Sequence, residues 1–247
     1  MITADIATVK PPHIRADLAS AIERSWRRLS GPGTWWSGAQ RLRIVAETRN
    51  AVHCPLCHER KAALSPNAVA GTHASLGTLP DVVVDVIHRV RTDANRLSEA
   101  WIERVLAAGL SDAEYVEIVG IVATATGLDT FSRALGTAPA ALPAPRAGAP
   151  SRRRPRGARK SIARVPTVSP ADMTDEDVNP YPQYGQVHIQ QALSLVPEAV
   201  IEFFDLDTAL YLKQDWIRDF TREYRSLTHA QLELIASRAS VINGCYY

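Results

Sequence analysis

Residues 111–135 read SDAEYVEIVGIVATATGLDTFSRAL, the longest helical pattern in the chain. Ser111, with Glu114 three residues later, forms a capping-box signature, which predicts a helix that begins just after Ser111. Apolar residues also recur in steps of three and four between residues 14 and 29, and no stretch shows the alternation typical of a strand. The sequence therefore predicts an all-α fold.

Shorter helical patterns flank this one. Ser37 is the predicted N-cap of a helix that delivers the chain to Cys54, and Thr228 is the predicted N-cap of a final helix. Further helices are expected at residues 81–90, 98–108, 187–196, 198–212 and 215–224.

The composition is that of a globular protein, and its net charge does not indicate a charged binding partner. The chain has 247 residues, 46% of them hydrophobic, and 28 basic against 26 acidic residues give a formal charge of +2. This balance gives no reason to expect nucleic-acid or membrane binding. Neither a leader-like segment nor an apolar run of about 18–20 residues is present, so we expect a cytoplasmic protein.

A composition change divides the chain. Between residues 137 and 182 the sequence is rich in Ala, Pro, Gly and Arg, and six basic residues cluster between Arg152 and Lys160. The run has no interleaved aromatic residues, so a linker is favoured over a nucleic-acid site. We expect helical units at residues 1–136 and 183–247.

The strongest chemical feature is the pair in Cys54-Pro55-Leu56-Cys57. Proline is favoured at the first helical position, so Cys54 is expected near the cap and Cys57 within the first turn. Free amides and the helix dipole stabilise a thiolate there, and the two sulfurs lie within disulfide reach. This placement is suited to a thiolate that is oxidised to sulfenic acid, forms a disulfide with its neighbour and is reduced by an external dithiol.

Nearby side chains are candidates for proton transfer. His58 follows Cys54 by four residues and can lie above its sulfur on the helix surface. Glu47 precedes Cys54 by seven residues and can face it if the preceding helix stays regular. Two simpler interpretations stay open: Glu47 can form a surface pair with Arg43, and His58 can be a solvated residue at the helix start.

Zinc is the competing use of the cysteines. A structural zinc site needs four ligands, and the chain has no second C-x-x-C. Cys54 and Cys57 would have to combine with two of three histidines: His53, His58 and His73. A further alternative is that both cysteines are buried and unreactive. The preferred interpretation assigns neither a metal nor a cofactor.

The sequence also repeats itself at an offset of 191 residues. Four correspondences carry the repeat: Ser37 with Thr228, Ala39-Gln40 with Ala230-Gln231, Ile44 with Ile235, and Cys54 with Cys245. They predict two degenerate copies of one helical unit. The second copy is expected to be cut short after Cys245-Tyr246-Tyr247 and to expose apolar surface around Ile235 and Val241.

These stretches resemble the alkylhydroperoxidase D-like branch of the carboxymuconolactone decarboxylase superfamily. The resemblance rests on residues 36–41 (WSGAQR), 50–57 (NAVHCPLC), 110–119 (LSDAEYVEIV), 232–236 (LELIA) and 243–245 (NGC). It covers about residues 30–136 and, as a fragment, residues 187–247. It implies an all-α bundle that forms homo-oligomers and reduces organic hydroperoxides with its cysteine pair.

The resemblance also implies roles for single residues. The family pattern is Glu, eleven residues, Cys, two residues, Cys, three residues, His. Carried over, Cys57 attacks the peroxide and Cys54 resolves the product. The Glu position is Leu42 and the His position is Lys61, so Glu47 and His58 would have to substitute from other positions.

The second copy shows the opposite departure from the pattern. Glu233 lies at the family spacing before Cys245, but the printed sequence holds no second cysteine or histidine after it.

The sequence as a whole predicts a thiol-dependent hydroperoxide reductase, an antioxidant oxidoreductase. Its expected partners are an organic hydroperoxide, an external dithiol reductant and further copies of itself. One alternative is a degenerate helical scaffold or binding module, whose thiols would keep ordinary pKa values near 8.5. The other is a decarboxylase-like lyase, which would need a proton donor from Glu47, His58 or Arg43 and would survive loss of both cysteines.

Overall fold

The computed structural model describes residues 14–161, 163–181 and 188–245. Regular structure in this part of the chain is helical, which confirms the all-α prediction, and the one strand-like pairing there is an isolated bridge between Arg159 and Thr167. Its helices are α1 (Ala16–Ser30), α2 (Gly38–Asn50), α3 (Pro55–Ala62), α4 (Asp81–Asp93), α5 (Glu99–Ala107), α6 (Asp112–Ala134), α7 (His188–Gln191), α8 (Pro197–Leu210), α9 (Gln214–Ile217) and α10 (His229–Asn243).

Parts of the sequence-based assignments fall outside the described residues: the chain start through His13, Ile162 and Pro182 of the expected linker, residues 183–187 at the start of the expected second unit and its first helix, and the tail at Tyr246 and Tyr247. Among the described helices, none is both long and apolar enough to cross a bilayer.

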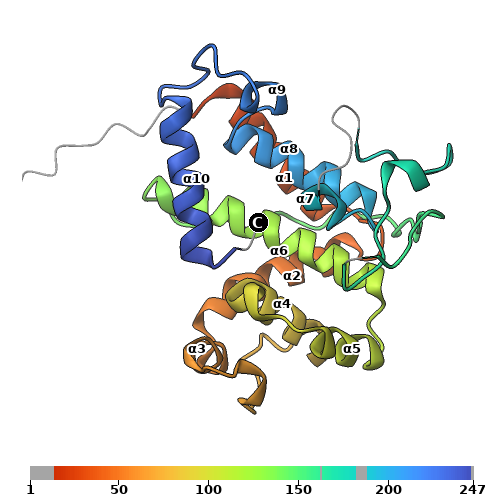
Figure 1. The fold of residues 1–247 in the computed structure, drawn as a ribbon. Coiled ribbons are helices and arrows are strands. Elements are labelled where there is room, and N and C mark those ends of the chain that lie inside the picture. The colour runs from red at the N-terminus through yellow and green to blue at the C-terminus, as the bar shows by residue number, and fades with distance from the viewer. Residues whose placement is uncertain (1–13, 162, 182–187, 246–247) are drawn as a thin grey trace, which may run out of the picture.

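Helix α6 is the centre of the fold. Its predicted capping box is present: the Ser111 hydroxyl accepts a hydrogen bond from the Glu114 amide at 3.2 Å, and the Glu114 carboxylate accepts one from the Ser111 amide at 3.0 Å. In Figure 1, α6 crosses the middle of the molecule, with α1 and α8 on one side and α2 and α4 on the other. Burial of apolar side chains from all of these helices against α6 stabilises the arrangement.

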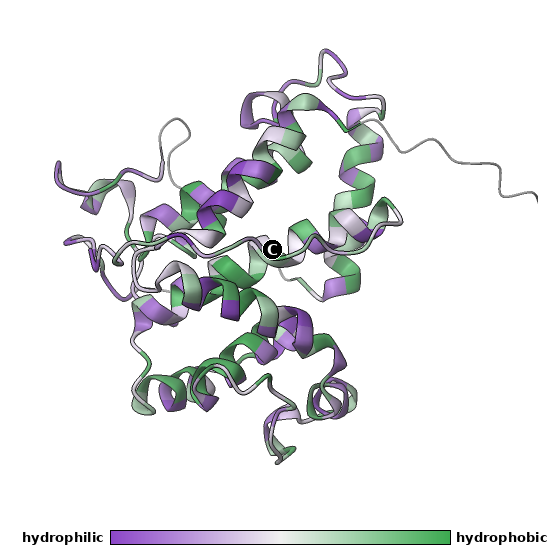
Figure 2. Cartoon of the chain, turned by 180° about the vertical axis from the view of Figure 1, so that it is seen from behind, coloured by the Kyte–Doolittle hydropathy of each residue, from purple (hydrophilic) through white to green (hydrophobic). Residues whose placement is uncertain are grey.

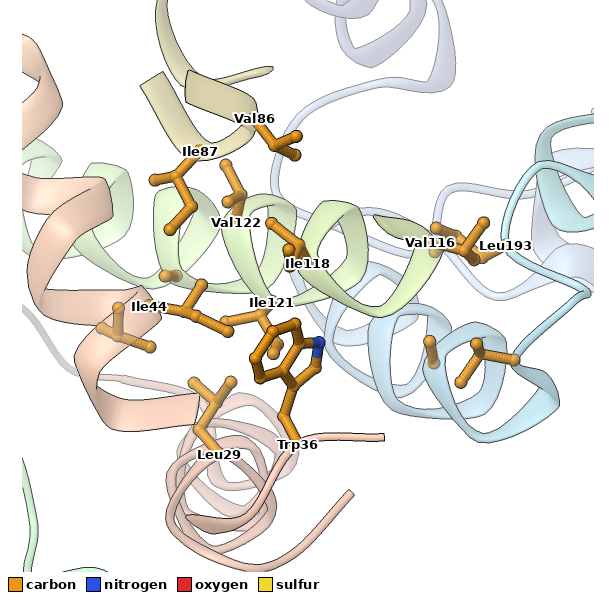
Figure 3. Close-up of a cluster of buried hydrophobic side chains, with 14 of the residues drawn as sticks. Leu29, Trp36, Ile44, Val86, Ile87, Val116, Ile118, Ile121, Val122 and Leu193 are labelled. Carbon is orange, nitrogen blue, oxygen red and sulfur yellow. The ribbon is translucent and has the colours of Figure 1, made fainter. Parts of the chain in front are cut away.

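The side chains of this core interlock around α6. Figure 3 shows Ile118 and Ile121 of α6 between Leu29 of α1, Ile44 of α2 and Ile87 of α4. All five side chains are buried. The same core cluster continues into residues 193–209, so a single core crosses both predicted helical units.

Polar contacts also join α1 to α8, which lie far apart in the sequence. Arg24 and Arg28 of α1 both bind the carboxylate of Asp205 on α8, at 2.8 and 2.6 Å. These partners are separated by 181 and 177 residues in the sequence. Helices α1 and α8 lie side by side in Figure 1.

The basic run predicted to be a linker is docked onto the helices. Arg154 forms two hydrogen bonds with Asp112 at the start of α6, at 2.6 and 2.8 Å. The guanidinium of Arg152 lies 5.5 Å from the centre of the Trp35 ring, which is a cation–π distance. Within the described residues, much of this segment is therefore held against the bundle.

Two expected helices are much shorter than the sequence patterns suggest. Within the described residues 188–196, the single turn α7 is the only helix. It ends at Gln191, whose carbonyl accepts a hydrogen bond from the Ser194 hydroxyl at 2.7 Å, and Pro197 disfavours helical geometry at Val196. The segment 215–224 contains only the single turn α9. There, the Asp219 carboxylate accepts hydrogen bonds from Thr221, and Trp216 stacks on Tyr224 with ring centres 4.5 Å apart. Such local side-chain bonds compete with helix formation.

The two predicted caps of the repeat are alike, but the helices that follow them are not equally buried. Ser37 with Gln40 and Thr228 with Gln231 both form complete capping boxes. Helix α2 contributes to the core, whereas α10 exposes Leu234, Ile235, Val241 and Ile242 by 57–70%. Figure 2 shows the largely apolar α10 at the side of the bundle. The expected apolar exposure around Ile235 and Val241 is confirmed, and the repeat itself stays a prediction.

A cluster of three charged residues joins α2, α6 and α8, and two of its members, Arg41 and Glu117, are buried. Arg41 of α2 lies between two carboxylates, with Glu202 of α8 at 2.5 Å and Glu117 of α6 at 3.8 Å. The Glu117 carboxylate also accepts a hydrogen bond from the Trp35 amide at 2.5 Å. Burial is the largest influence on Glu117 and outweighs the attraction of Arg41, so the pKa of this carboxyl rises to about 7.

The raised pKa of Glu117 predicts a loss of stability with rising pH. The folded protein holds a proton on Glu117 that the unfolded chain releases near its ordinary pKa of 4.5. The free energy of unfolding should therefore fall as pH rises from about 4.5 to 7, by up to about 3 kcal/mol from this group. Urea unfolding at pH 5 and pH 8 measures the loss. Glu117→Gln should lose distinctly less stability than the parent over this interval, and equal losses would contradict the assignment.

Candidate thiol and histidine site

The cysteine pair lies at the start of α3, as the sequence predicts. Cys54 occupies the N-cap position, Pro55 the first helical position and Cys57 the first turn. Both thiols are free and almost completely buried, with exposed fractions of 0% and 1%. The short loop between them keeps the two sulfurs close, which disulfide formation requires.

Two histidines meet these sulfurs. His88 of α4 places Nδ1 3.3 Å from the Cys57 sulfur. His73, in the segment between α3 and α4, places Nδ1 3.4 Å from the Cys57 sulfur and 3.6 Å from the Cys54 sulfur. Cys57 therefore contacts both imidazoles, whereas Cys54 contacts one.

A buried carboxylate orients His88. Glu47 of α2 accepts a hydrogen bond from His88 Nε2 at 2.8 Å, and both side chains are 0% exposed. Glu47 also accepts hydrogen bonds from the Asn50 side chain at 2.8 Å and the Leu76 amide at 3.0 Å. These three donors fix the carboxylate, which in turn holds His88 with Nδ1 facing the sulfur of Cys57.

A second carboxylate orients His73 in the same way. Asp85 of α4 lies 2.9 Å from His73 Nε2 and accepts a hydrogen bond from the Trp101 indole at 2.7 Å. Arg60 of α3 lies 3.2 Å from Asp85 and 3.1 Å from His73. The site thus contains two parallel chains, each of a carboxylate, a histidine and a sulfur.

This environment favours the thiolate at Cys57. Burial disfavours ionisation, but hydrogen bonds from His73 and His88 outweigh it and lower the pKa of Cys57 to about 6. The pKa of Cys54 is also lowered: burial opposes this, and the Cys57 amide and His73 favour it. The pKa of His73 rises to about 10 because Asp85 and the sulfurs outweigh its burial.

Glu47 is the one predicted proton-transfer residue that the structure brings to the cysteines, through His88. His58 is exposed and bonds the Val52 carbonyl at 2.7 Å, so it is not placed to act on either sulfur. Glu47 is completely buried, so the surface pair with Arg43 considered from the sequence is absent. The three residues on which the lyase alternative depends do not converge.

The histidines at the site are His73 and His88, whereas the sequence favours His58. The sequence suggests His73 only as a zinc ligand, and His88, which lies 31 residues after Cys57, is not among its candidates. The sequence signal for His88 is weak. It lies one helical turn after Val84 in the mostly apolar stretch 82–90, but Asp85, Arg91 and Thr92 share its side of α4, so the pattern does not single it out.

The remnant residues of the second copy lie in a different environment. Glu233 contacts the Tyr211 hydroxyl and lies 3.4 Å from His229. Cys245 is exposed, and its amide donates a hydrogen bond to the Ser240 carbonyl.

A surface hollow adjoins the site on the His73 side. It is lined in part by Arg60, Val69, Gly71 and Asp85. Because His73 contacts Arg60 and Asp85 through Nε2 and the sulfurs through Nδ1, its ring lies between this hollow and the cysteines. The side chain of His73 is 9% exposed.

The four donor atoms of the cluster are close enough together to share one metal ion. The ligand atoms of Cys54, Cys57, His73 and His88 all lie within 4.8 Å of one another. Comparisons with known proteins found no matching family model, curated protein or solved structure.

Proposed function

We propose that this protein is a dithiol hydroperoxide reductase in which Cys57 attacks the peroxide. The observation that carries the proposal is the buried chain from Glu47 through His88 to the Cys57 sulfur, with Cys54 beside it. A nucleophilic thiolate next to a histidine that is oriented by a carboxylate is a recurrent arrangement for activating cysteine.

The first step is attack on the O–O bond. The Cys57 thiolate attacks one peroxide oxygen of ROOH, the O–O bond breaks, and Cys57 becomes a sulfenic acid. The departing alkoxide takes up a proton and leaves as the alcohol ROH. His88, hydrogen-bonded to the sulfur and oriented by Glu47, is placed to supply that proton.

The second step closes the disulfide. The Cys54 sulfur attacks the Cys57 sulfenic acid, an S–S bond forms, and the hydroxyl leaves as water after protonation. An external dithiol then reduces the disulfide by two electrons and becomes a disulfide itself. Cys54 contacts His73, which is therefore placed as a second proton carrier for this exchange.

In the proposed reaction, the substrate reaches the Cys57 sulfur after the His73 ring has moved aside. Both thiols are buried, and the His73 ring separates them from the neighbouring hollow. A small organic hydroperoxide can approach Cys57 once that ring rotates away from the sulfurs.

The resemblance to the alkylhydroperoxidase D-like branch supports the same assignment. The family glutamate and histidine positions hold Leu42 and Lys61 in this chain. We propose that Glu47 and His88 take over their roles. We also propose a cytoplasmic homo-oligomer, which agrees with the free thiols and with the apolar residues exposed on α10.

Titration of free thiols tests the proposal. The reduced, metal-free protein has three free cysteines and should lose two thiols after one equivalent of an organic hydroperoxide. Cys245→Ser should also lose two, because Cys245 is exposed and lies outside the site. Unchanged thiol counts in both proteins would refute the proposed function.

A further inference from the structure

We propose that the reduced protein binds one Zn²⁺ at Cys54, Cys57, His73 and His88, and that oxidation by a hydroperoxide releases the ion. The metal-binding part stands on geometry alone, whereas the release part rests on the proposed function. This proposal departs from the sequence-based preference for a site without metal.

The donor set matches the preferences of zinc. Two thiolates and two imidazoles are a common ligand set for tetrahedral structural zinc. Among the described residues, this is the group of donors that converges closely enough to hold an ion. The sequence offers no second C-x-x-C, but the fold supplies the two missing ligands from α4 and from the segment before it.

Three of the six distances between donor atoms are close to those of a tetrahedral site, and the other three are at most 4.8 Å. With zinc–sulfur bonds of about 2.3 Å and zinc–nitrogen bonds of about 2.0–2.1 Å, a sulfur and a nitrogen ligand lie roughly 3.6 Å apart. The three sulfur–nitrogen contacts in the cluster measure 3.3, 3.4 and 3.6 Å. An ion can therefore be accommodated with little movement of the ligands.

The carboxylates that contact the two histidines are also arranged as they commonly are around a bound metal ion. A histidine that binds zinc through one ring nitrogen commonly gives its other N–H to a carboxylate, which fixes the ring and the tautomer. Both histidines do so here: His88 Nε2 faces Glu47 at 2.8 Å, and His73 Nε2 faces Asp85 at 2.9 Å. Both Nδ1 atoms are left pointing at the sulfurs.

Four protein ligands make this a closed site. A closed zinc site leaves no position for water or substrate, so it stabilises structure instead of activating a reactant. The ion would tie the start of α3 to α4 and to the His73 segment. It would also occupy the lone pairs of both sulfurs, so zinc and hydroperoxide should compete for the same thiolates.

The release step balances in atoms and electrons. Zinc-bound Cys54 and Cys57 thiolates give two electrons to ROOH. With two protons, the products are ROH, water, the Cys54–Cys57 disulfide and free Zn²⁺. A disulfide offers no thiolate to the ion, and two histidines alone bind zinc far more weakly.

Zinc titration of the reduced protein, without peroxide, tests the metal site. We expect one Zn²⁺ per chain, and cobalt in its place should give the absorption of a tetrahedral ion with sulfur ligands. His73→Asn should abolish stoichiometric binding, and Asp85→Asn should weaken it by about 10- to 100-fold. Matched controls are His53→Asn and Cys245→Ser, which remove a histidine and a cysteine outside the cluster and should bind one ion like the parent.

Two results would overturn the metal site: no stoichiometric zinc in the folded parent, or equal binding by the parent and His73→Asn. Because His73 lies in the segment between α3 and α4 and not in a helix of the core, this variant is expected to fold, and circular dichroism checks it. Release is then measured with a chelating dye, with one ion expected per disulfide formed. If the metal-free protein oxidises but the parent never binds zinc, the inference fails alone. If zinc binds but peroxide leaves the thiols of metal-free protein unchanged, the proposed function fails together with the release step, and the metal site stands.

Discussion

Cys57→Ser should abolish the loss of thiols that an organic hydroperoxide causes in the metal-free protein. Cys57 is the sulfur that both His73 and His88 contact, and its pKa is lowered to about 6, so it is the thiolate available near neutral pH. A serine hydroxyl has no comparable reactivity toward peroxide. Free thiols, counted before and after one equivalent of hydroperoxide, measure the effect.

Cys54→Ser separates attack from resolution. This variant should still react at Cys57, but the sulfenic acid should persist and be trapped by a dimedone-type reagent, because the resolving thiol is missing. Cys245→Ser is the matched control and should behave like the parent, since its thiol is exposed outside the site. Trapping on Cys54 in Cys57→Ser, with none on Cys57 in Cys54→Ser, would reverse the two roles.

Glu47→Ala should lower the free energy of unfolding by about 3 kcal/mol, which is a large part of the stability of an ordinary domain. The carboxylate is completely buried and satisfies three donors, from His88, Asn50 and Leu76. Alanine leaves these donors without an acceptor in a buried place, which costs far more than the loss of the side chain itself. Chemical denaturation at pH 7 measures the change.

Glu47→Gln is the matched variant. Glutamine keeps the shape of the side chain and one oxygen that accepts hydrogen bonds. This variant should therefore lose less than half as much stability as Glu47→Ala. It removes the negative charge that orients and supports His88, so the rate of the peroxide reaction should fall even in protein that is fully folded. Parent-like stability of Glu47→Ala would contradict the network around His88, and a parent-like rate in Glu47→Gln would remove Glu47 from the proposed chemistry.

Much of the fold was predictable because its signals are local. Capping boxes at Ser111, Ser37 and Thr228 mark helices that the structure contains, and the position of Pro55 places α3 correctly. The helix expected at residues 215–224 is wrong because local hydrogen bonds to the Asp219 carboxylate compete with helix formation there. The docking of α8 into the core was not predictable, because the pattern of one helix does not specify which other helix it packs against.

The candidate site was only half predictable, for a related reason. The C-x-x-C spacing and its helix position are sequence features, and so is the proximity of Glu47 at the end of the preceding helix. His88 joins the site through the packing of α4 on α2 and α3, and His73 through a segment with no regular periodicity. His58, the neighbour in sequence, is directed to the Val52 carbonyl instead.

The pairing of α1 with α8 has a consequence for the order in which the chain acquires structure during translation. Because α1 binds Asp205 about 180 residues downstream, its docking surface does not exist until α8 has left the ribosome. At roughly 5–20 residues per second, the side of α1 that packs on α8 waits on the order of 10–40 s for its partner. Nascent chains that end between α5 and α8 are therefore expected to be chaperone substrates, although they already carry every residue of the thiol site.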